Sequence, residues 1–252
     1  MERWSHEIRQ FIEEDIIGDR FETVVEENDY VDSFIMHINE SRVPALDRDT
    51  ALFALEDIIG GHSAVGNFLT KVFAYLVQNP EVQRKIQEEV DAATNNNDEL
   101  IGLEHRASMQ YTQAAVMEAL RLIASPIVPH VSNQDTTVNG YDVEADTLVF
   151  LNNYELSMSP KLWDNPEAFK PERFLKCGVL VKPDFFLPFG AGRRSCIGYK
   201  LVQFISFTIL ANIMAKYSLN AVENENYKVQ IGSLAVPEKT FQVEIQPRNS
   251  CC

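Results

Sequence analysis

The feature that most constrains the fold of this 252-residue chain is one long stretch of helical periodicity. Apolar residues recur every three to four positions from Asp47 onward, and Pro80 ends the pattern because proline disfavours helix at the residue before it. The pattern predicts a helix over about residues 49–79, which is long for a globular protein. Its middle holds Gly60-Gly61, a pair that lowers helix propensity. We therefore expect a packing or ligand reason for this glycine pair.

The rest of the chain predicts a mainly α protein with minor β structure. Helical spacing recurs on both sides of the long helix, and short β-prone pieces with turn signals follow residue 127. Asn139-Gly140 predicts a hairpin in which Thr136–Val138 pairs with Thr147–Leu151. The other expected elements are two amphipathic helices within residues 5–40, helices over 81–93, 109–123 and 201–216, and terminal strands within 229–245.

Charge and cysteine content narrow the class of function. With 22 Lys and Arg against 37 Asp and Glu, the net charge of −15 argues against a nucleic-acid partner, because phosphate contacts need clustered basic side chains. Residues 181–200 are basic against this trend, so we expect a local role there. Four cysteines are too few and too irregular for a disulfide framework and indicate a reducing, cytosol-facing environment. We expect no signal peptide or membrane span in the chain, since the longest uncharged stretch, 201–215, is too short to cross a bilayer.

The loop from Phe189 to Gly198 is rich in glycine and holds two arginines and Cys196. A single cysteine is more often a small buried apolar residue than a ligand. Here the glycines let the backbone approach a bulky flat partner, and the arginines with the N-terminus of the following helix favour a thiolate over a thiol. A thiolate can serve as the axial ligand of an iron centre. We therefore interpret Cys196 as a candidate iron ligand.

Two further motifs precede this loop in order. Glu118 and Arg121 lie at positions i and i+3, where they can pair on one helix face, although surface helices often carry this pattern. The segment Phe169–Phe174 then supplies Arg173. With the Cys196 loop, these motifs make nearly the whole chain similar to the cytochrome P450 haem-thiolate enzymes. The resemblance implies the C-terminal portion of the cytochrome P450 fold, a haem b (heme b) whose iron is bound by Cys196, and a structural triad of Glu118, Arg121 and Arg173.

The same resemblance implies roles for other residues near the haem. Arg194 matches a basic position that contacts a haem propionate, and His130 lies where the family often has a second basic residue for that purpose. An exposed loop histidine is the other interpretation of His130. Phe189 would pack beside the thiolate, exclude water and tune its donor strength. Gly60 and Gly61 would admit dioxygen or a substrate oxygen close to the iron.

Proton delivery is where the chain departs from the pattern of the family it resembles. That pattern places an acid and then a threonine after the glycine pair, but the chain has Ser63 and Ala64 at these positions. Ala64 has no donor, Ser63 has one hydroxyl, and His62 is a residue type that titrates near neutral pH. We expect a relay through Ser63 and ordered water, with His62 as a further candidate, or a substrate hydroxyl in place of the missing threonine.

The finer resemblance is to the Spook/Spookier branch of the insect ecdysteroid-synthesis enzymes, carried by residues 55–68, 118–131, 150–154 and 195–202. It implies a monooxygenase that oxidises a sterol between 7-dehydrocholesterol and the ketodiol, using O₂ and electrons from an NADPH-dependent reductase. Arg193 and Lys200 lie where the reductase would meet a basic proximal surface. The full-length enzyme would lie on the cytosolic face of the endoplasmic reticulum membrane.

Two other functions stay open on the sequence. A haem-thiolate isomerase or dehydratase would rearrange an oxygenated sterol without consuming O₂ and without a reductase. The chain also looks like only the C-terminal half of such an enzyme, without the membrane anchor, the N-terminal sheet and the early helices. A truncated chain that cannot hold haem would have at most an interaction role, which a haem absorbance spectrum would reveal.

Overall fold

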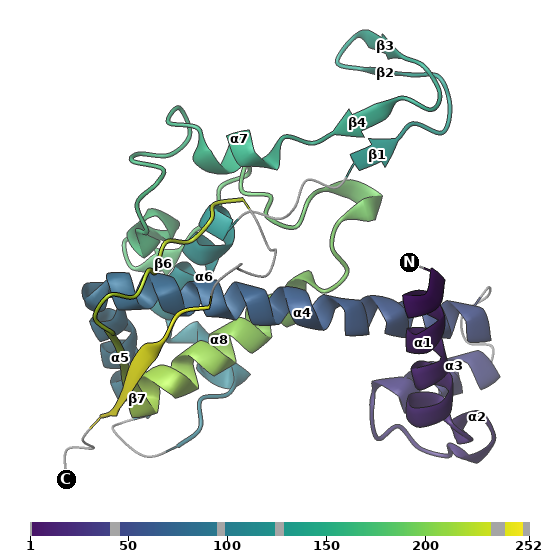
Figure 1. The fold of residues 1–252 in the computed structure, drawn as a ribbon, viewed down its shortest axis with the longest axis horizontal. Helices are drawn as coiled ribbons and strands as arrows, with labels where there is room; N and C mark the ends of the chain where they lie inside the picture. The colour runs from purple at the N-terminus through teal and green to yellow at the C-terminus, as the bar shows by residue number, and fades with distance from the viewer. Residues whose placement is uncertain (1, 41–45, 95–98, 124–128, 233–239, 249–252) are drawn as a thin grey trace. The chain divides into compact units, whose positions relative to one another are not determined.

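The computed structural model describes residues 2–40, 46–94, 99–123, 129–232 and 240–248, with side chains from residue 6 onward. Helices dominate these ranges, and the strands within them form two-stranded antiparallel sheets (Figure 1). This confirms the expected fold class, mainly α with minor β. No helix in the ranges given is both long enough and apolar enough to cross a membrane. The terminal Cys251 and Cys252 lie outside the described residues.

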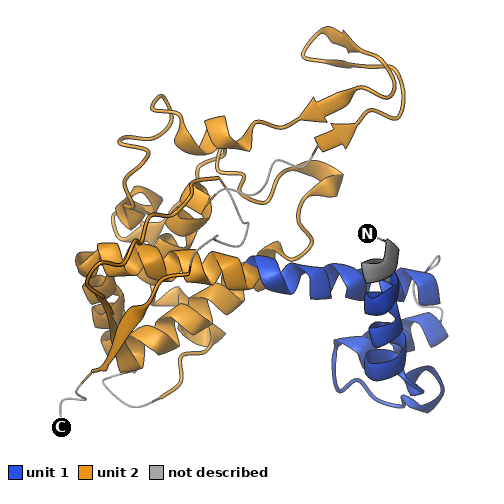
Figure 2. Ribbon diagram, viewed as in Figure 1, with its two compact units in different colours: residues 1–64 blue, residues 65–252 orange. Residues whose placement is uncertain are grey.

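The chain divides into two compact units, residues 1–64 and residues 65–252, and the boundary falls inside one continuous helix (Figure 2). This helix, α4, runs from Arg48 to Gln78. It stops before Pro80, which opens the next helix at a position where the missing N–H of proline costs no hydrogen bond.

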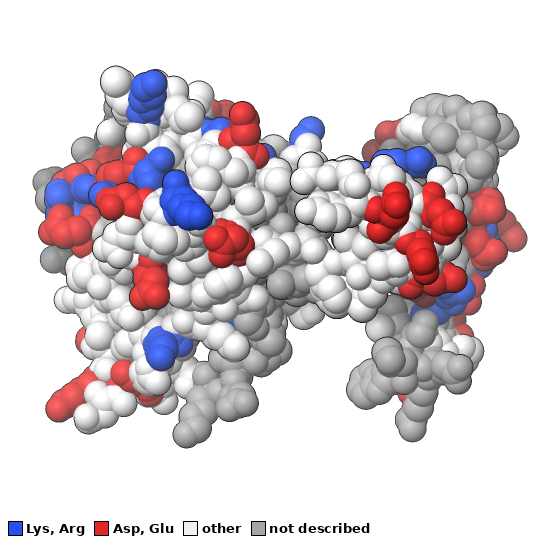
Figure 3. Space-filling view, turned by 90° about the horizontal axis from the view of Figure 1, so that it is seen from above, with Lys and Arg blue, Asp and Glu red and all other residues white. Residues whose placement is uncertain are grey.

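Unit 1 contains α1 (Glu2–Phe11), the π-helical turn η1 (Ile12–Ile17), α2 (Arg20–Thr23), α3 (Tyr30–Asn39) and the first part of α4. Its small apolar core consists of Ile12, Ile17, Ile35, Leu52 and Leu55. The two amphipathic helices expected within residues 5–40 are thus present in a more broken form, because Gly18 ends η1 with a φ of +53°. The unit is acidic, with 16 of the 37 Asp and Glu and 5 of the 22 Lys and Arg (Figure 3). The basic segment 181–200 belongs to unit 2.

Unit 2 is built around α6 (Gln110–Ile123), of whose 14 residues 11 are buried. α6 packs against α5 (Pro80–Thr94), α8 (Tyr199–Lys216) and the short 3₁₀ helix η3 (Pro171–Phe174). The remaining helical pieces are η2 (Leu103–Ala107), α7 (Asn153–Met158) and η4 (Gly192–Arg194). Because α6 is covered on all sides, any charge on it must find its partner inside the protein.

The strand pairing around Asn139-Gly140 differs from the expected one. β2 (Thr136–Val138) pairs with β3 (Tyr141–Val143), not with the segment after Thr147. Asn139 and Gly140 have φ values of +50° and +84°, so the turn has two residues and the next three must pair at once. β4 (Leu148–Phe150) pairs instead with β1 (Pro129–Val131).

The C-terminal strands also differ from the expectation. β7 (Tyr217–Ala221) follows α8 directly and pairs with β8 (Val243–Pro247). The described part of residues 229–245 contains strand only from Val243 onward, so the expectation of strand from residue 229 is wrong. A last small sheet pairs β5 (Leu175–Lys176) with β6 (Val179–Leu180).

Candidate functional site

The structure joins Glu118, Arg121 and Arg173 in one cluster, here called the Glu118 cluster. Glu118 and Arg121 are one turn apart on α6, and neither side chain is exposed. Nε and Nη2 of Arg121 donate to the two carboxylate oxygens of Glu118 at 2.8 Å each, a bidentate arrangement. Nε of Arg173, from η3, donates to Oε1 of Glu118 at 2.9 Å. The backbone N–H of Lys170 adds a further donor to this carboxylate at 3.0 Å.

The cluster holds two guanidinium groups for one carboxylate, so it carries excess positive charge in a buried place. Backbone carbonyls accept further N–H groups, Ser157 from Arg121 at 2.7 Å and Asp164 from Arg173 at 3.0 Å. The centre of the Trp163 ring lies 5.1 Å from Cζ of Arg121 and 5.7 Å from Cζ of Arg173, within the range of cation–π attraction. These contacts tie α6 to the segment between α7 and β5, so the geometry suits a structural role.

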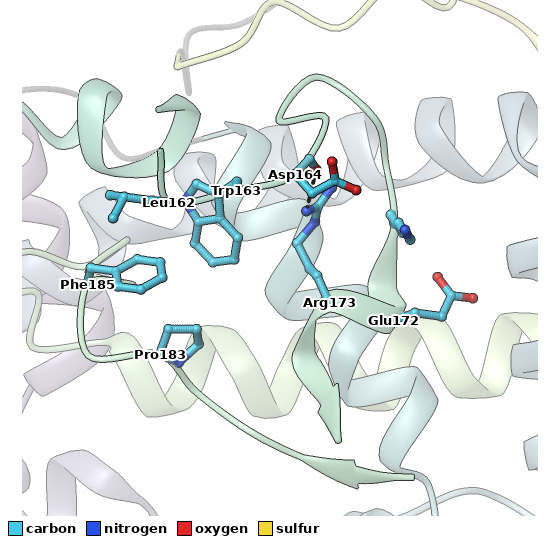
Figure 4. A pocket seen from close by; sticks show the side chains of 8 residues that line it. Leu162, Trp163, Asp164, Glu172, Arg173, Pro183 and Phe185 are labelled. Atoms are coloured by element: carbon cyan, nitrogen blue, oxygen red, sulfur yellow. Dashed lines mark hydrogen bonds between the residues drawn. The ribbon is translucent and has the colours of Figure 1, made fainter. Parts of the chain in front are cut away.

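A pocket of about 460 Å³ borders the Glu118 cluster (Figure 4). It is lined by Leu162, Trp163, Asp164, Lys170, Glu172, Arg173, Pro183 and Phe185. Glu172 accepts hydrogen bonds from Nζ of Lys85 at 2.5 Å and from the hydroxyl of Tyr111 at 3.0 Å. Burial acts to raise the pKa of Glu172, but these hydrogen bonds outweigh it and hold the pKa below the ordinary value. The lining includes none of the residues expected at the haem.

The Cys196 loop has an irregular backbone that requires glycine. Gly190 and Gly192 have φ values of +76° and +75°, in the left-handed region that side chains with a Cβ rarely adopt. The N–H of Cys196 donates to the carbonyl of Phe189 at 2.9 Å, which closes the loop just before α8. The thiol of Cys196 is exposed, and an added Cβ at Gly198 would come within 3.9 Å of its sulfur. The loop therefore presents one accessible thiol beside small residues.

His130 and Arg194 are both in unit 2, as is Cys196. His130 lies on β1, and its Nδ1 is buried without a hydrogen-bond partner in the described part of the chain. Buried polar atoms normally have a partner, so a polar group from outside these residues is expected there. Arg194 is exposed on η4.

Large apolar side chains are exposed on β1 and its partner β4, and from the end of the Cys196 loop into α8. They are Val131, Leu148, Phe150, Ile197, Tyr199 and Leu201. Haem is a flat apolar ring with two carboxylates and an iron that accepts a thiolate. The thiol of Cys196, the cation of Arg194, the unpartnered nitrogen of His130 and the bare apolar side chains fit these requirements. The residues present are thus chemically suited to haem.

Gly60, Gly61, His62 and Ser63 lie on α4 within unit 1, so the structure describes them separately from Cys196. His62 and Ser63 are exposed, and an added Cβ at Gly60 or Gly61 would meet no atom within 4 Å. Oγ of Ser63 donates to the carbonyl of Gly60 at 3.3 Å. The role of these four residues therefore stays a prediction.

Sequence reasoning missed several contributors to the Glu118 cluster. They include the ring of Trp163 and the backbone N–H of Lys170, both more than 40 residues after Glu118, and the carbonyls of Ser157 and Asp164. No local pattern marks a backbone donor, so this contact could come only from the structure. Trp163 stands next to Asp164 in an irregular proline-punctuated region, where periodicity says nothing about burial.

Comparison with known proteins gives consistent matches along the chain. The family described as cytochrome P450 matches residues 3–245. Cytochrome P450 307a1 of Drosophila melanogaster is 38% identical over 97% of this chain and 50% of its own length. Farnesoate epoxidase of Bombyx mori is 33% identical over 88% of this chain and 46% of its own length. Human cytochrome P450 2U1 is 31% identical over 92% of this chain and 45% of its own length. The chain thus spans about half the length of the curated relatives it matches.

Proposed function

Because this chain belongs to the cytochrome P450 family, we propose that it forms the haem-thiolate-binding part of a monooxygenase that oxidises a sterol in ecdysteroid biosynthesis. The proposed step lies between 7-dehydrocholesterol and the ketodiol and rests on the resemblance to the Spook/Spookier branch. The 38% identity to an insect cytochrome P450 over nearly the whole chain supports an insect enzyme of this kind. The observation that carries the proposal is the exposed thiol of Cys196 in its glycine- and arginine-rich loop.

The proposed cofactor is haem b, with Cys196 as its iron ligand. When bound, haem supplies the activation of dioxygen. Arg194 and Nδ1 of His130 would hold its carboxylates. Phe189, whose ring centre is 6.3 Å from that of Tyr199, would cover the thiol side and exclude water.

The residues proposed to handle protons and gases are on α4. Gly60 and Gly61 leave open space where a Cβ would stand, which gives room for dioxygen or a substrate oxygen. The hydroxyl of Ser63 makes a long hydrogen bond of 3.3 Å to a carbonyl three residues back, so its proton can turn towards another acceptor at small cost. His62 is exposed beside it and offers a second proton carrier.

The partners follow from the same assignment. The substrate would be a sterol, O₂ the co-substrate, and an NADPH-dependent reductase the electron donor, meeting a basic surface that includes Arg193 and Lys200. Both side chains are exposed. The proposed location is the cytosolic face of the endoplasmic reticulum membrane, and a nucleic-acid partner is excluded from the proposal by the net charge of −15.

The test measures sterol product and hydrogen peroxide from the haem-loaded protein with NADPH and reductase. Ser63→Ala should lower product formation by about 100-fold, the lower end for a positioned proton donor, and raise peroxide release. Ser108→Ala is the matched control, because its Oγ also donates to a carbonyl three residues back, at 2.9 Å to His105. Equal rates in both variants would remove Ser63 from the mechanism. Absence of a haem spectrum in the expressed chain would leave the non-catalytic fragment as the function.

One observation favours the isomerase or dehydratase as a second candidate. Ala64 has no proton donor, so proton delivery to dioxygen is less well served than in the family pattern. An isomerase would form product without reductase and without O₂ uptake. Product that requires both would decide for the monooxygenase.

A further inference from the structure

The tip of the β2–β3 hairpin is the two-residue turn Asn139-Gly140, and both residues are exposed (Figure 1). The register pairs Val138 with Tyr141, so the turn itself lies outside the strand ladder. Asn139 and Gly140 have φ values of +50° and +84°, which asparagine and glycine readily adopt in such turns. The turn geometry accounts for both residue types, but their order in the chain also permits a chemical reaction.

The side-chain amide of an asparagine can react with the backbone nitrogen of the following residue. That nitrogen loses its proton to base and attacks Cγ, a succinimide ring forms, and the side-chain nitrogen leaves as ammonia. Water then opens the ring at either carbonyl, which gives aspartate or isoaspartate. The reaction consumes only water, and it requires an accessible backbone N–H and little steric hindrance at the attacking residue.

Gly140 meets both requirements. Its N–H has no hydrogen-bond partner in the part of the chain that the structure describes, and it has no Cβ to hinder ring closure. Ring closure also needs the backbone of Asn139 to rotate out of the turn. A lone two-stranded hairpin is only marginally stable in water, and β2 and β3 include no buried residue, so this rotation is accessible.

Two other asparagines of unit 2 share the left-handed backbone and provide internal references. Asn165, with a φ of +44°, precedes Pro166, whose nitrogen carries no proton and cannot attack. Asn224, with a φ of +65°, precedes Glu225, whose side chain hinders ring closure and whose N–H already donates to a backbone carbonyl at 3.3 Å. Of these three asparagines, Asn139 alone has a free and unhindered neighbour.

We propose that Asn139 is a self-modifying site whose conversion to isoaspartate opens the tip of the hairpin. Isoaspartate carries the main chain through Cβ and Cγ, which adds a backbone atom to a turn that fits two residues. Aspartate before glycine still suits this turn, so the aspartate product adds charge without opening it. The new carboxylate is uncompensated nearby, since residues 122–160 contain five Asp or Glu and neither Lys nor Arg. The inference goes beyond the proposed function, because it needs neither haem nor sterol.

The expected opening is confined to the tip. Ser132 links the two chains of the hairpin below it, where its N–H donates to the carbonyl of Thr147 at 3.0 Å and its Oγ to the carbonyl of Glu144 at 2.6 Å. Below these bonds β1 pairs with β4, and His130 lies opposite Val149. Neither contact involves the turn, so the base of the hairpin should stay closed.

Peptide mapping by mass spectrometry, after the folded chain has been kept in warm and mildly alkaline buffer, tests the site. Asn139 should lose its amide before Asn165 and Asn224, and an isoaspartate methyltransferase with S-adenosylmethionine should label the peptide that contains it. Asn139→Gly is the matched variant, because two glycines also form this turn but carry no side-chain amide. It should give no methyl label at the tip. Conversion of Asn224 ahead of Asn139, or equal labelling of both proteins, would overturn the site.

Nuclear magnetic resonance of the separated isoaspartate form tests the opening. Cross-strand nuclear Overhauser effects between Val138 and Tyr141 should disappear, whereas those between His130 and Val149 should stay. Unchanged effects between Val138 and Tyr141 would overturn the opening. Loss of the effects at both pairs would overturn its confinement to the tip.

Discussion

Arg121→Ala tests whether the Glu118 cluster holds the fold together. The change removes two 2.8 Å hydrogen bonds to Glu118, one bond to the carbonyl of Ser157 and the contact with Trp163. Glu118 stays fully buried and keeps only Arg173 and a backbone donor. Loss of one partner from a buried ion pair costs about 3–5 kcal/mol, out of about 5–15 kcal/mol for a typical domain. The folded-to-unfolded ratio should fall by about 140- to 3700-fold, at about 1.4 kcal/mol per tenfold.

Urea unfolding followed by far-ultraviolet circular dichroism measures this change. With an m-value of about 3 kcal/mol/M, the midpoint should fall by about 1–1.7 M at unchanged slope. Arg84→Ala is the matched control, since Arg84 pairs with Glu81 at the same i, i+3 spacing and also with Glu88, but with 52% of its side chain exposed. We expect no resolvable shift of the midpoint from this exposed pair. Equal midpoints in the two variants would refute the structural role of the Glu118 cluster.

Three other predictions concern single groups. In the haem-loaded protein, Cys196→Ala should abolish the thiolate-type carbon-monoxide difference spectrum and Cys177→Ala should leave it intact, and a normal spectrum from the first would contradict the assignment. Burial raises the pKa of Tyr75 to about 12, so its contribution to stability is complete below about pH 10 and is lost as the pH rises towards 12. Tyr75→Phe should reduce the alkaline decline of the urea midpoint without abolishing it, because burial also raises the pKa of Tyr111; an unchanged decline would contradict the prediction. Burial acts to raise the pKa of Glu172, but hydrogen bonds from Lys85 and Tyr111 outweigh it and hold the pKa below the ordinary glutamate value. The contribution of Glu172 to the free energy of unfolding is therefore present above the ordinary glutamate pKa and is lost as the pH falls. Glu172→Gln should therefore flatten the acid side of the urea midpoint profile, and the same acid slope in both proteins would show that other groups set it.

Helices whose ends are set by residues close in the sequence were predictable from the sequence alone. α4 spans Arg48–Gln78 against an expected 49–79, because Pro80 ends a helix whatever the rest of the fold does. α6 begins one residue later than expected, and its described part reaches Ile123. α4 is a long periodic segment, for which local spacing carries most of the information.

Strand partners were not predictable in the same way. β7 follows α8 without a turn signal, and its partner β8 begins 22 residues after β7 ends, so neither strand identifies the other locally. The sequence predicts the segment after Thr147 as the second strand of the Asn139-Gly140 hairpin. In the structure Tyr141–Val143 is that strand, because the two-residue turn pairs the residues that follow it directly. The pairing of β7 with β8 depends on tertiary packing, whereas the pairing of β2 with β3 follows from the two-residue turn between them.

The Glu118 cluster shows which part of a site a motif can predict. The pattern Glu-x-x-Arg occurs at Glu81–Arg84 on α5 and again at Glu118–Arg121 on α6, yet the first pair is exposed and the second is fully buried. The flanking residues distinguish the two pairs. Glu81 and Arg84 lie among other charged residues, whereas Glu118 and Arg121 are the only charged residues between residues 114 and 123. A charged pair on a helix that is apolar on every side cannot reach water, so it must be compensated from elsewhere in the chain. The sequence therefore indicates that further donors and acceptors exist for the second pair. Their identity depends on how residues 157–173 pack against α6.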